Sequence, residues 1–123
     1  MELTSVSEFF EVQRLAWTEK QFQAALLKAY CGTKKEPLPA GIAWKPFHTF
    51  FSKNSMAGWP DVVLLRGGRM VIAELKAENG RLRPEQRECL DLLRQAEAAI
   101  ASPAFIVREW RPHDWGEISE VLA

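Results

Sequence analysis

The residues in this chain best suited to chemistry are two carboxylates and one amine, Asp61, Glu74 and Lys76. Glu74 and Lys76 lie two residues apart in an apolar run, so on a β-strand both side chains point to one face. Two neighbouring carboxylates repel each other, and a divalent cation such as Mg²⁺ or Mn²⁺ relieves that repulsion. Such a cation activates water and stabilises negative charge on a phosphate. Lys76 would then hold the attacking water or neutralise the phosphate.

A predicted β-hairpin positions these three side chains. Residues 61–66 and 70–76 are both rich in apolar residues, and Gly67-Gly68 between them is a two-residue turn signal. Counted outward from the turn, Asp61 and Glu74 lie at nearly equal distances along the two strands. We therefore expect both carboxylates and Lys76 to meet at the open end of the hairpin.

The simplest alternative for Glu74 and Lys76 is an exposed ion-pairing face, because Glu-x-Lys is a common pattern on strands. The neighbours of Glu74 argue against it. Val71-Ile72 precede the glutamate, and Ala73 and Leu75 flank it. A strand of this composition is expected to be buried, and buried charges are paired or bound to a metal. This context favours a functional site.

Two helices are predicted on either side of the hairpin. Thr18 and Gln21 form a capping box at the start of the first, and an apolar stripe follows from residue 22 to 30 before Gly32. Pro84 is expected at the first helical position of the second. Residues 5–14 contain enough apolar points for a further short helix.

The rest of the chain completes an α/β domain. A third strand is predicted over residues 104–109 and a short final helix over residues 114–122. Residues 33–60 are rich in proline, glycine and aromatic residues and are predicted to be irregular. We expect residues 1–123 to form one domain, in which helices flank a small mixed sheet in two or three layers.

Composition restricts the function only weakly. The 16 Lys and Arg balance the 16 Asp and Glu, which argues against a protein that coats nucleic acid by charge alone. No run of about 18 apolar residues predicts a membrane span, and Met1-Glu2-Leu3-Thr4 does not resemble a secretion signal. We expect a cytoplasmic protein in which Cys31 and Cys89 are buried thiols rather than a disulfide.

The order of the motifs resembles that of a known nuclease superfamily. Gly58-Trp59-Pro60-Asp61, then Glu74-Leu75-Lys76, then Gln86, is similar to the PD-(D/E)xK pattern. More narrowly, residues 18–118 resemble a stand-alone virus-type replication-repair nuclease (VRR-NUC) domain. Residues 82–93 are similar to that family's glutamine helix, and Trp110-Arg111-Pro112 is similar to its usual end.

The resemblance implies a restriction-endonuclease-like fold and a role for each matching residue. Asp61 and Glu74 would bind Mg²⁺ or Mn²⁺, with the backbone carbonyl of Leu75 as a further ligand. Lys76 would be the catalytic lysine, and Gln86 would orient water or phosphate. Glu19 matches an early acidic residue of the family and would either reach the metal through water or bind a second metal ion. From the residues alone, Glu19 can equally be a first-turn acid that stabilises its helix dipole, and Gln86 a solvated helix residue.

Candidate DNA contacts follow from the same resemblance and from charge. The residues proposed to contact phosphates are His48, Ser52, Arg81, Arg83 and Arg87, with Arg66 and Arg69 as further donors near the site. The alternative for the arginines is ordinary surface charge, since glutamates lie between them, and His48 can equally be a packed or surface residue. Three tryptophans, Trp44, Trp59 and Trp110, can stack on bases, but core packing is the favoured interpretation.

Three functions remain open at this level. The first is a metal-dependent, structure-selective DNA endonuclease, acting as a homodimer on branched DNA such as four-way junctions; the resemblance also implies a phage or prophage setting. The second is a flap-cutting or exonucleolytic nuclease. The third is a non-catalytic nucleic-acid- or protein-binding module on the same fold. The motif residues argue against this third function, because every motif position holds a chemically competent residue.

Overall fold

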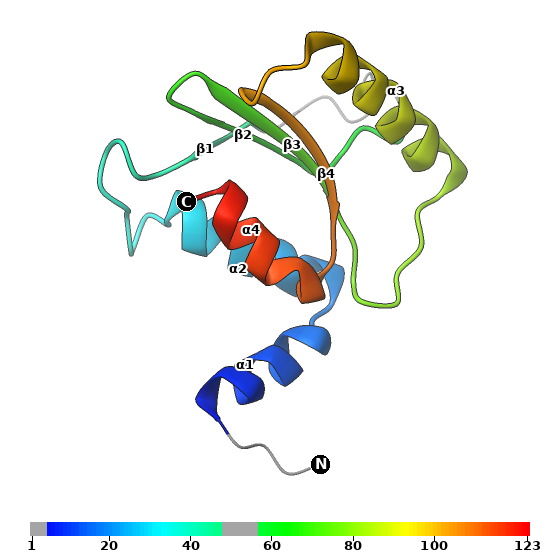
Figure 1. Cartoon of the computed structure of the whole chain (residues 1–123). Coiled ribbons are helices and arrows are strands. Elements are labelled where there is room, and N and C mark those ends of the chain that lie inside the picture. Colours follow the sequence, from blue (N-terminus) through cyan, green and yellow to red (C-terminus); the bar gives the residue numbers. More distant parts are fainter. Residues whose placement is uncertain (1–4, 48–56) are drawn as a thin grey trace.

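The computed structural model describes residues 5–47 and 57–123. Its centre is a four-stranded mixed sheet in the order β1-β2-β3-β4, and its helices lie on both faces of that sheet (Figure 1). In chain order the elements are α1 (Val6–Leu15), α2 (Glu19–Cys31), β1 (Lys45–Phe47), β2 (Val62–Arg66), β3 (Arg69–Leu75), α3 (Pro84–Ile100), β4 (Phe105–Trp110), the 3₁₀ turn η1 (Pro112–Asp114) and α4 (Trp115–Val121). The predicted α/β class and the mixed sheet flanked by helices are confirmed.

The hairpin of β2 and β3 forms in the predicted register. Val62 pairs with Ala73 and Arg66 with Arg69 in an antiparallel ladder. Gly67 and Gly68 make the turn with φ of +55° and +80°, values that suit the tight turns of twisted hairpins and cost a glycine little. β4 then adds to β3 in parallel, after the crossover through α3. Register and turn together place the start of β2 beside the end of β3.

The two faces of the sheet have different partners. Alternate residues of β2 and β3 pack into one hydrophobic core with α2 and α4, the buried members being Phe22, Leu26, Trp44, Val62, Leu64, Val71, Ala73, Leu75, Trp110, Ile118 and Leu122. The intervening residues face α3, which buries Gln86, Cys89 and Leu90. Glu74 lies between Ala73 and Leu75, so it points to the α3 side. The fold is therefore three-layered, with the acidic residue in the layer beneath α3.

Local signals set where the two long helices begin. The amide of Gln21 donates to Thr18 Oγ1 at 3.1 Å, and the amide of Thr18 donates to Gln21 Oε1 at 2.9 Å, so the predicted capping box is present. Pro84 is the first residue of α3, as predicted. The cap fixes Glu19 as the first residue of α2, and the proline fixes Gln86 in the first turn of α3.

Two parts of the fold differ from the sequence prediction. Residues 33–60 were expected to be irregular, yet Lys45–Phe47 form β1, the edge strand beside β2. Proline at the centre of this strand obscures its signal, and an edge strand tolerates that residue. The helix predicted over residues 114–122 is confirmed within one residue at each end as α4, and the 3₁₀ turn η1, which was not predicted, precedes it. Within the described residues, no helix is both long and apolar enough to cross a membrane.

Candidate active site

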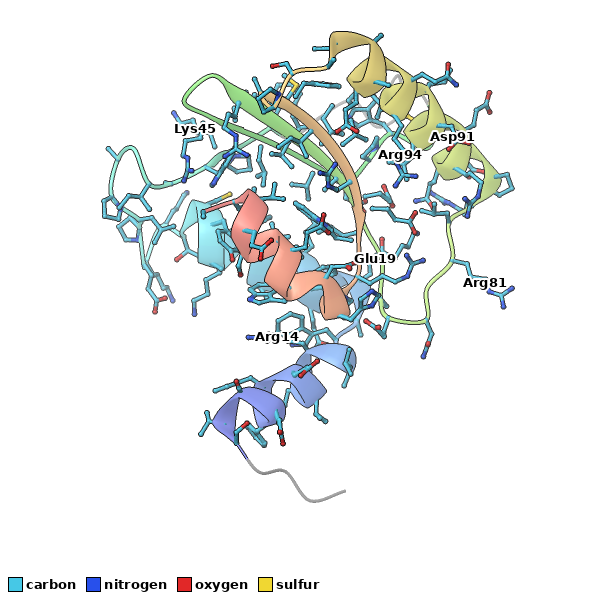
Figure 2. The ribbon with its side chains drawn as sticks, viewed as in Figure 1. Arg14, Glu19, Lys45, Arg81, Asp91 and Arg94 are labelled. Atoms are coloured by element: carbon cyan, nitrogen blue, oxygen red, sulfur yellow. The ribbon has the colours of Figure 1, made fainter. Side chains whose placement is uncertain are left out.

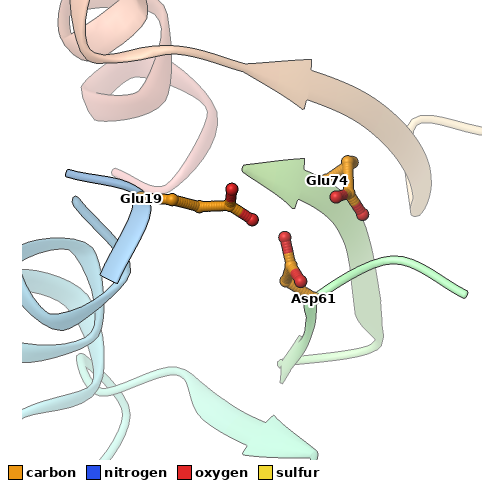
Figure 3. Close-up of side chains that lie close together, drawn as sticks. All are labelled: Glu19, Asp61 and Glu74. Atoms are coloured by element: carbon orange, nitrogen blue, oxygen red, sulfur yellow. The ribbon is translucent and has the colours of Figure 1, made fainter. Parts of the chain in front are cut away.

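Three carboxylates from separate elements meet at one end of the sheet (Figure 3). Glu19 opens α2, Asp61 immediately precedes β2, and Glu74 is the penultimate residue of β3. Each offers one oxygen, and these three oxygens all lie within 4.8 Å of one another. The sequence prediction that Asp61 and Glu74 converge is confirmed, and Glu19 joins them.

The hairpin register explains why Asp61 and Glu74 meet. Because Val62 pairs with Ala73, the next residue outward on each strand brings Asp61 opposite Glu74. The amide of Leu75 donates to Asp61 Oδ2 at 3.1 Å, which anchors one oxygen of that carboxylate. Leu75 itself points its side chain into the core. The backbone of β3 thus helps to fix the position of the Asp61 carboxylate.

Glu74 is fully buried, with no exposed surface on its side chain. Its Oε1 accepts a hydrogen bond from Gln86 Nε2 at 2.9 Å. Its Oε2 has no hydrogen-bond partner among the described residues, although it is also buried. A buried acceptor without a partner is costly. This oxygen belongs to a side chain of the Glu19–Asp61–Glu74 cluster, and a divalent cation with oxygen ligands fits this arrangement.

Burial is the main cause of a raised pKa at Glu74. It raises the pKa of Glu74 from 4.5 to about 8, with the negative charge of Asp61 as the next contribution. The ammonium of Lys76 acts in the opposite direction. At neutral pH the metal-free carboxyl of Glu74 therefore holds a proton, which a bound cation must displace.

The pKa of Glu74 predicts how the metal-free protein responds to pH. Between about pH 4.5 and pH 8 the folded protein keeps a proton that the unfolded chain has lost. The free energy of unfolding should therefore fall as pH rises through this window, by at most about 1.4 kcal/mol per pH unit from this group. Urea unfolding in EDTA from pH 5 to pH 9 measures this free energy of unfolding. An identical pH dependence in Glu74→Gln would contradict this assignment.

Lys76 is buried in the same cluster, with a relative exposure of 7%. Its Nζ lies 3.8 Å from Glu19 Oε2 and 3.8 Å from Glu74 Oε1. These distances keep the ammonium beside the carboxylates without a short hydrogen bond to either. The group is thus charge-compensated, and its donors stay available to an incoming ligand.

Gln86 is a buried residue with two partners, and the solvated alternative is wrong. Its Oε1 accepts from the amide of Arg83 at 2.9 Å, while its Nε2 donates to Glu74. The first contact ties the side chain to the start of α3, and the second orients the Glu74 carboxylate. The geometry therefore gives Gln86 a direct contact with a candidate metal ligand.

The five residues proposed as the main phosphate contacts differ in where the structure places them. His48 and Ser52 lie outside the described residues. Arg81, Arg83 and Arg87 are exposed on the turn before α3 and on its first turns, and Arg83 pairs with Glu85 at 3.3 Å. They lie in sequence next to Gln86, which reaches the cluster. Their positions are compatible with DNA binding.

Arg66 and Arg69 are not near the site, which corrects the prediction for these two residues. They flank the Gly67-Gly68 turn, at the opposite end of the hairpin from Asp61. Arg66 donates to the Ile42 carbonyl at 2.9 Å and lies over the Trp44 ring. Arg69 donates to the Val121 carbonyl at 3.1 Å. Both arginines therefore have structural roles. Each guanidinium group donates to a backbone carbonyl and also makes a cation–π contact with the indole ring of Trp44.

The tryptophans mainly serve packing. Trp44 and Trp110 are buried in the core, and Trp44 Nε1 donates to the Leu122 carbonyl at 3.0 Å. Trp59 is partly buried, and its Nε1 has no partner among the described residues. The favoured core interpretation is confirmed for the first two.

Sequence reasoning missed the structural role of Gly58. Its φ is +83°, and a Cβ built on it would lie 2.2 Å from the Glu85 carbonyl oxygen and 2.6 Å from the Gln86 nitrogen. The backbone before Asp61 therefore packs directly on the first turn of α3. This contact brings Asp61 and the Gln86–Glu74 pair into one assembly. Its sequence signal, a single glycine before Trp-Pro-Asp, does not reveal the distant partner.

Substitution of Gly58 by alanine should destabilise the protein strongly. The positive φ alone costs about 1–3 kcal/mol for a non-glycine residue, and the overlap with Glu85 adds to this. Gly41→Ala is the matched control, because Gly41 has φ +86° and a Cβ built on it would meet no atom within 4 Å. Chemical denaturation should show a larger loss for Gly58→Ala. Equal losses would mean that the packing on α3 contributes nothing.

The chain matches a known protein family. The family described as the VRR-NUC domain matches residues 13–102. The matched span contains Glu19, Asp61, Glu74, Lys76 and Gln86, and it ends before β4. Comparisons with curated proteins and with solved structures give no match.

Proposed function

Because the chain belongs to the VRR-NUC family of nuclease-type domains, we propose that it is a divalent-metal-dependent deoxyribonuclease that hydrolyses phosphodiester bonds. The observation that carries the proposal is the Glu19–Asp61–Glu74 cluster, in which the buried Glu74 Oε2 lacks a partner among the described residues. The Lys76 ammonium lies 3.8 Å from the other oxygen of this carboxyl group, Oε1. Three acidic oxygens next to one buried amine suit chemistry on a phosphate.

The candidate metal ligands are Asp61, Glu74 and Glu19, with the Leu75 carbonyl as a further ligand. Carboxylate and carbonyl oxygens are the ligands that Mg²⁺ and Mn²⁺ prefer. When bound, the cation would polarise the phosphate and make water a stronger nucleophile at neutral pH. Glu19 has 43% of its side chain accessible, against none for Glu74, so it is well placed to act through water.

Lys76 and Gln86 would have separate roles in the reaction. Lys76 would donate hydrogen bonds to the attacking water or to a non-bridging phosphate oxygen, where negative charge grows in the transition state. Gln86 would hold Glu74 in one orientation through its 2.9 Å hydrogen bond. In the overall reaction, water oxygen bonds to phosphorus, the ester P–O bond breaks, and the leaving oxygen gains a proton. The chain needs no covalent intermediate for this sequence.

We propose branched DNA, including four-way junctions, as the preferred substrate and a homodimer as the active form. The 16 basic and 16 acidic residues balance over these 123 residues, so net charge alone would not select the DNA. Selectivity would then come from the shape of the DNA presented to two copies of the site. Two free thiols, Cys31 and Cys89, suit action in the reducing cytoplasm.

A cleavage panel tests the function. Wild type and Glu74→Ala would be incubated with linear, flap, splayed and four-way DNA in Mn²⁺, with sedimentation to measure the oligomeric state. The proposal expects cleavage by the wild type alone and strongest cleavage of the four-way substrate. Preference for flaps or for ends would favour the flap-cutting or exonucleolytic alternative. A monomer that cuts four-way junctions symmetrically would remove the dimer.

A non-catalytic binding module remains the alternative from another class. It differs in one measurable property, because a binding module on this fold needs no metal. Titration of wild type and Asp61→Ala with Mg²⁺ and Mn²⁺ separates the two functions. Binding by neither protein would favour the module, whereas binding by the wild type alone would support the enzyme.

The exposed arginines should determine the salt dependence of DNA binding. Arg81 and Arg87 are exposed and have no ion pair within residues 5–47 and 57–123. Replacing Arg87 by glutamine should reduce the slope of log K against log salt by about 1, as expected for one lost phosphate contact. Lys45→Gln is the control, since Lys45 lies opposite Leu65 near the far turn of the hairpin and away from Arg81 (Figure 2). Equal slopes for both variants would count against this DNA-binding surface.

A further inference from the structure

The turn that follows Lys76 is fastened to the segment that follows β4. Arg111 donates from Nη2 to the Gly80 carbonyl at 2.8 Å, and its Nη1 bonds to Glu109. Two residues on, the His113 amide donates to Glu78 Oε2 at 3.1 Å. Arg111 and His113 therefore both join residues 77–80, which lead away from the site, to the segment at the end of β4, and Arg111 is the one that contacts Gly80.

The turn formed by residues 77–80 lies close to Lys76. The Gly80 amide donates to the Ala77 carbonyl at 2.9 Å, which folds the turn back on the strand. A Cβ built on Gly80 would lie 3.5 Å from the Cβ of Lys76. The Lys76 amide also donates to the Trp110 carbonyl at 3.0 Å, next to Arg111 in the chain. Lys76 is thus held at its backbone by β4, and the turn that Arg111 contacts runs close to its Cβ.

Arg111 also compensates charge beside the cluster. Glu109 pairs in register with Glu74 across the parallel β3–β4 ladder, so both side chains leave the same face of the sheet. The Glu109 side chain is only 18% exposed. Without Arg111 its carboxylate would add a further unpaired negative charge to a region that already holds three carboxylates.

We propose that Arg111 is a positioning residue for Lys76, a role that rests on the proposed function of that lysine. The guanidinium has its donors in a planar fork, so it can bind a carbonyl and a carboxylate at the same time. It acts through the Gly80 turn and does not reach the reacting atoms. The family match ends at residue 102, so Arg111 belongs to a part of the chain that the match does not cover.

Arg108 provides a matched control. It lies in β4, is 35% exposed against 23% for Arg111, and pairs with two glutamates, Glu97 and Glu117. These partners belong to α3 and α4, and neither belongs to the turn after Lys76. Replacing Arg108 by methionine therefore removes ion pairs of the same kind and leaves the Gly80 link intact.

The test compares Arg111→Met, Arg111→Lys and Arg108→Met in the full chain. Amide hydrogen exchange at Lys76 and Gly80 should accelerate about tenfold or more in Arg111→Met and stay unchanged in Arg108→Met. In the Mn²⁺ cleavage assay, Arg111→Met should lower kcat about tenfold or more with little change in KM, as displacement of a catalytic group does. Arg111→Lys should recover part of kcat, because it keeps the charge.

Two results would overturn this role. One is unchanged exchange at Lys76 and Gly80 in Arg111→Met, which needs no enzymatic activity to be measured. The other is an equal loss of kcat in Arg111→Met and Arg108→Met, which would mean a general effect on stability. If the wild type cleaves no DNA, the proposed function fails, while the exchange measurement still decides whether Arg111 holds the turn.

Discussion

Replacement of Lys76 by methionine should lower kcat for DNA cleavage by about 10³-fold, with the fold and DNA binding retained. Removal of one preorganised donor to a transition-state charge costs about 10²–10³ in kcat, and an ammonium carries full charge. Methionine keeps most of the buried aliphatic stem of Lys76, which is 7% exposed. Single-turnover cleavage in Mn²⁺ measures the chemical step, and circular dichroism checks the fold.

Metal binding should not weaken in Lys76→Met, in contrast to the loss of cleavage. The lysine places a positive charge 3.8 Å from carboxylate oxygens of Glu19 and Glu74. Its removal should leave Mn²⁺ affinity unchanged or higher, because cation and ammonium repel each other. Lys20→Met is the control, since Lys20 is exposed on α2 beside Glu19. An unfolded Lys76→Met protein, or cleavage equal to that of Lys20→Met, would refute a catalytic role for Lys76.

Replacement of Glu74 by glutamine should reduce Mn²⁺ affinity by roughly 100-fold or more and abolish cleavage. The substitution removes one charged ligand from a buried position, where its attraction to a divalent cation is strong. Shape and size are preserved, and an amide oxygen can still accept the hydrogen bond from Gln86. Isothermal titration with Mn²⁺ measures the affinity directly.

Stability separates this result from simple misfolding. Without metal at pH 8, Glu74→Gln should be at least as stable as the wild type, because burial has raised the pKa of Glu74 to about 8 and the charged form is disfavoured. With Mn²⁺, the wild type should gain in Tm and Glu74→Gln should not. Glu88→Gln, an exposed change on α3, is the control for net charge and should keep the gain. A metal-induced gain in Tm equal in both variants would exclude Glu74 as a ligand.

Much of the candidate site could be predicted because it depends on short-range rules. The two-residue periodicity of a strand placed Glu74 and Lys76 on one face, and Gly67-Gly68 set the register that brings Asp61 opposite Glu74. The capping box at Thr18 placed Glu19 at the start of α2. These signals involve residues that are close in the chain or joined by one turn.

The parts that could not be predicted depend on contacts between distant segments. Gly58 must be glycine because the Glu85 carbonyl lies against it, and nothing near Gly58 in the sequence indicates this. Arg66 resembled a phosphate donor by type, yet it donates to the carbonyls of Ile42 and Ala123. An arginine in a sequence carries the same charge in both settings. Only the tertiary arrangement decides which partner it takes.

The double engagement of Gln86 makes the start of α3 and the assembly of the site a single cooperative event. One end of its amide completes the hydrogen bonding of the first helical turn, and the other fixes the carboxyl group of Glu74. Fraying of that turn would therefore release Glu74 at the same moment. A ligand that needs an ordered Glu74 will, by reciprocity, favour the wound state of the helix end.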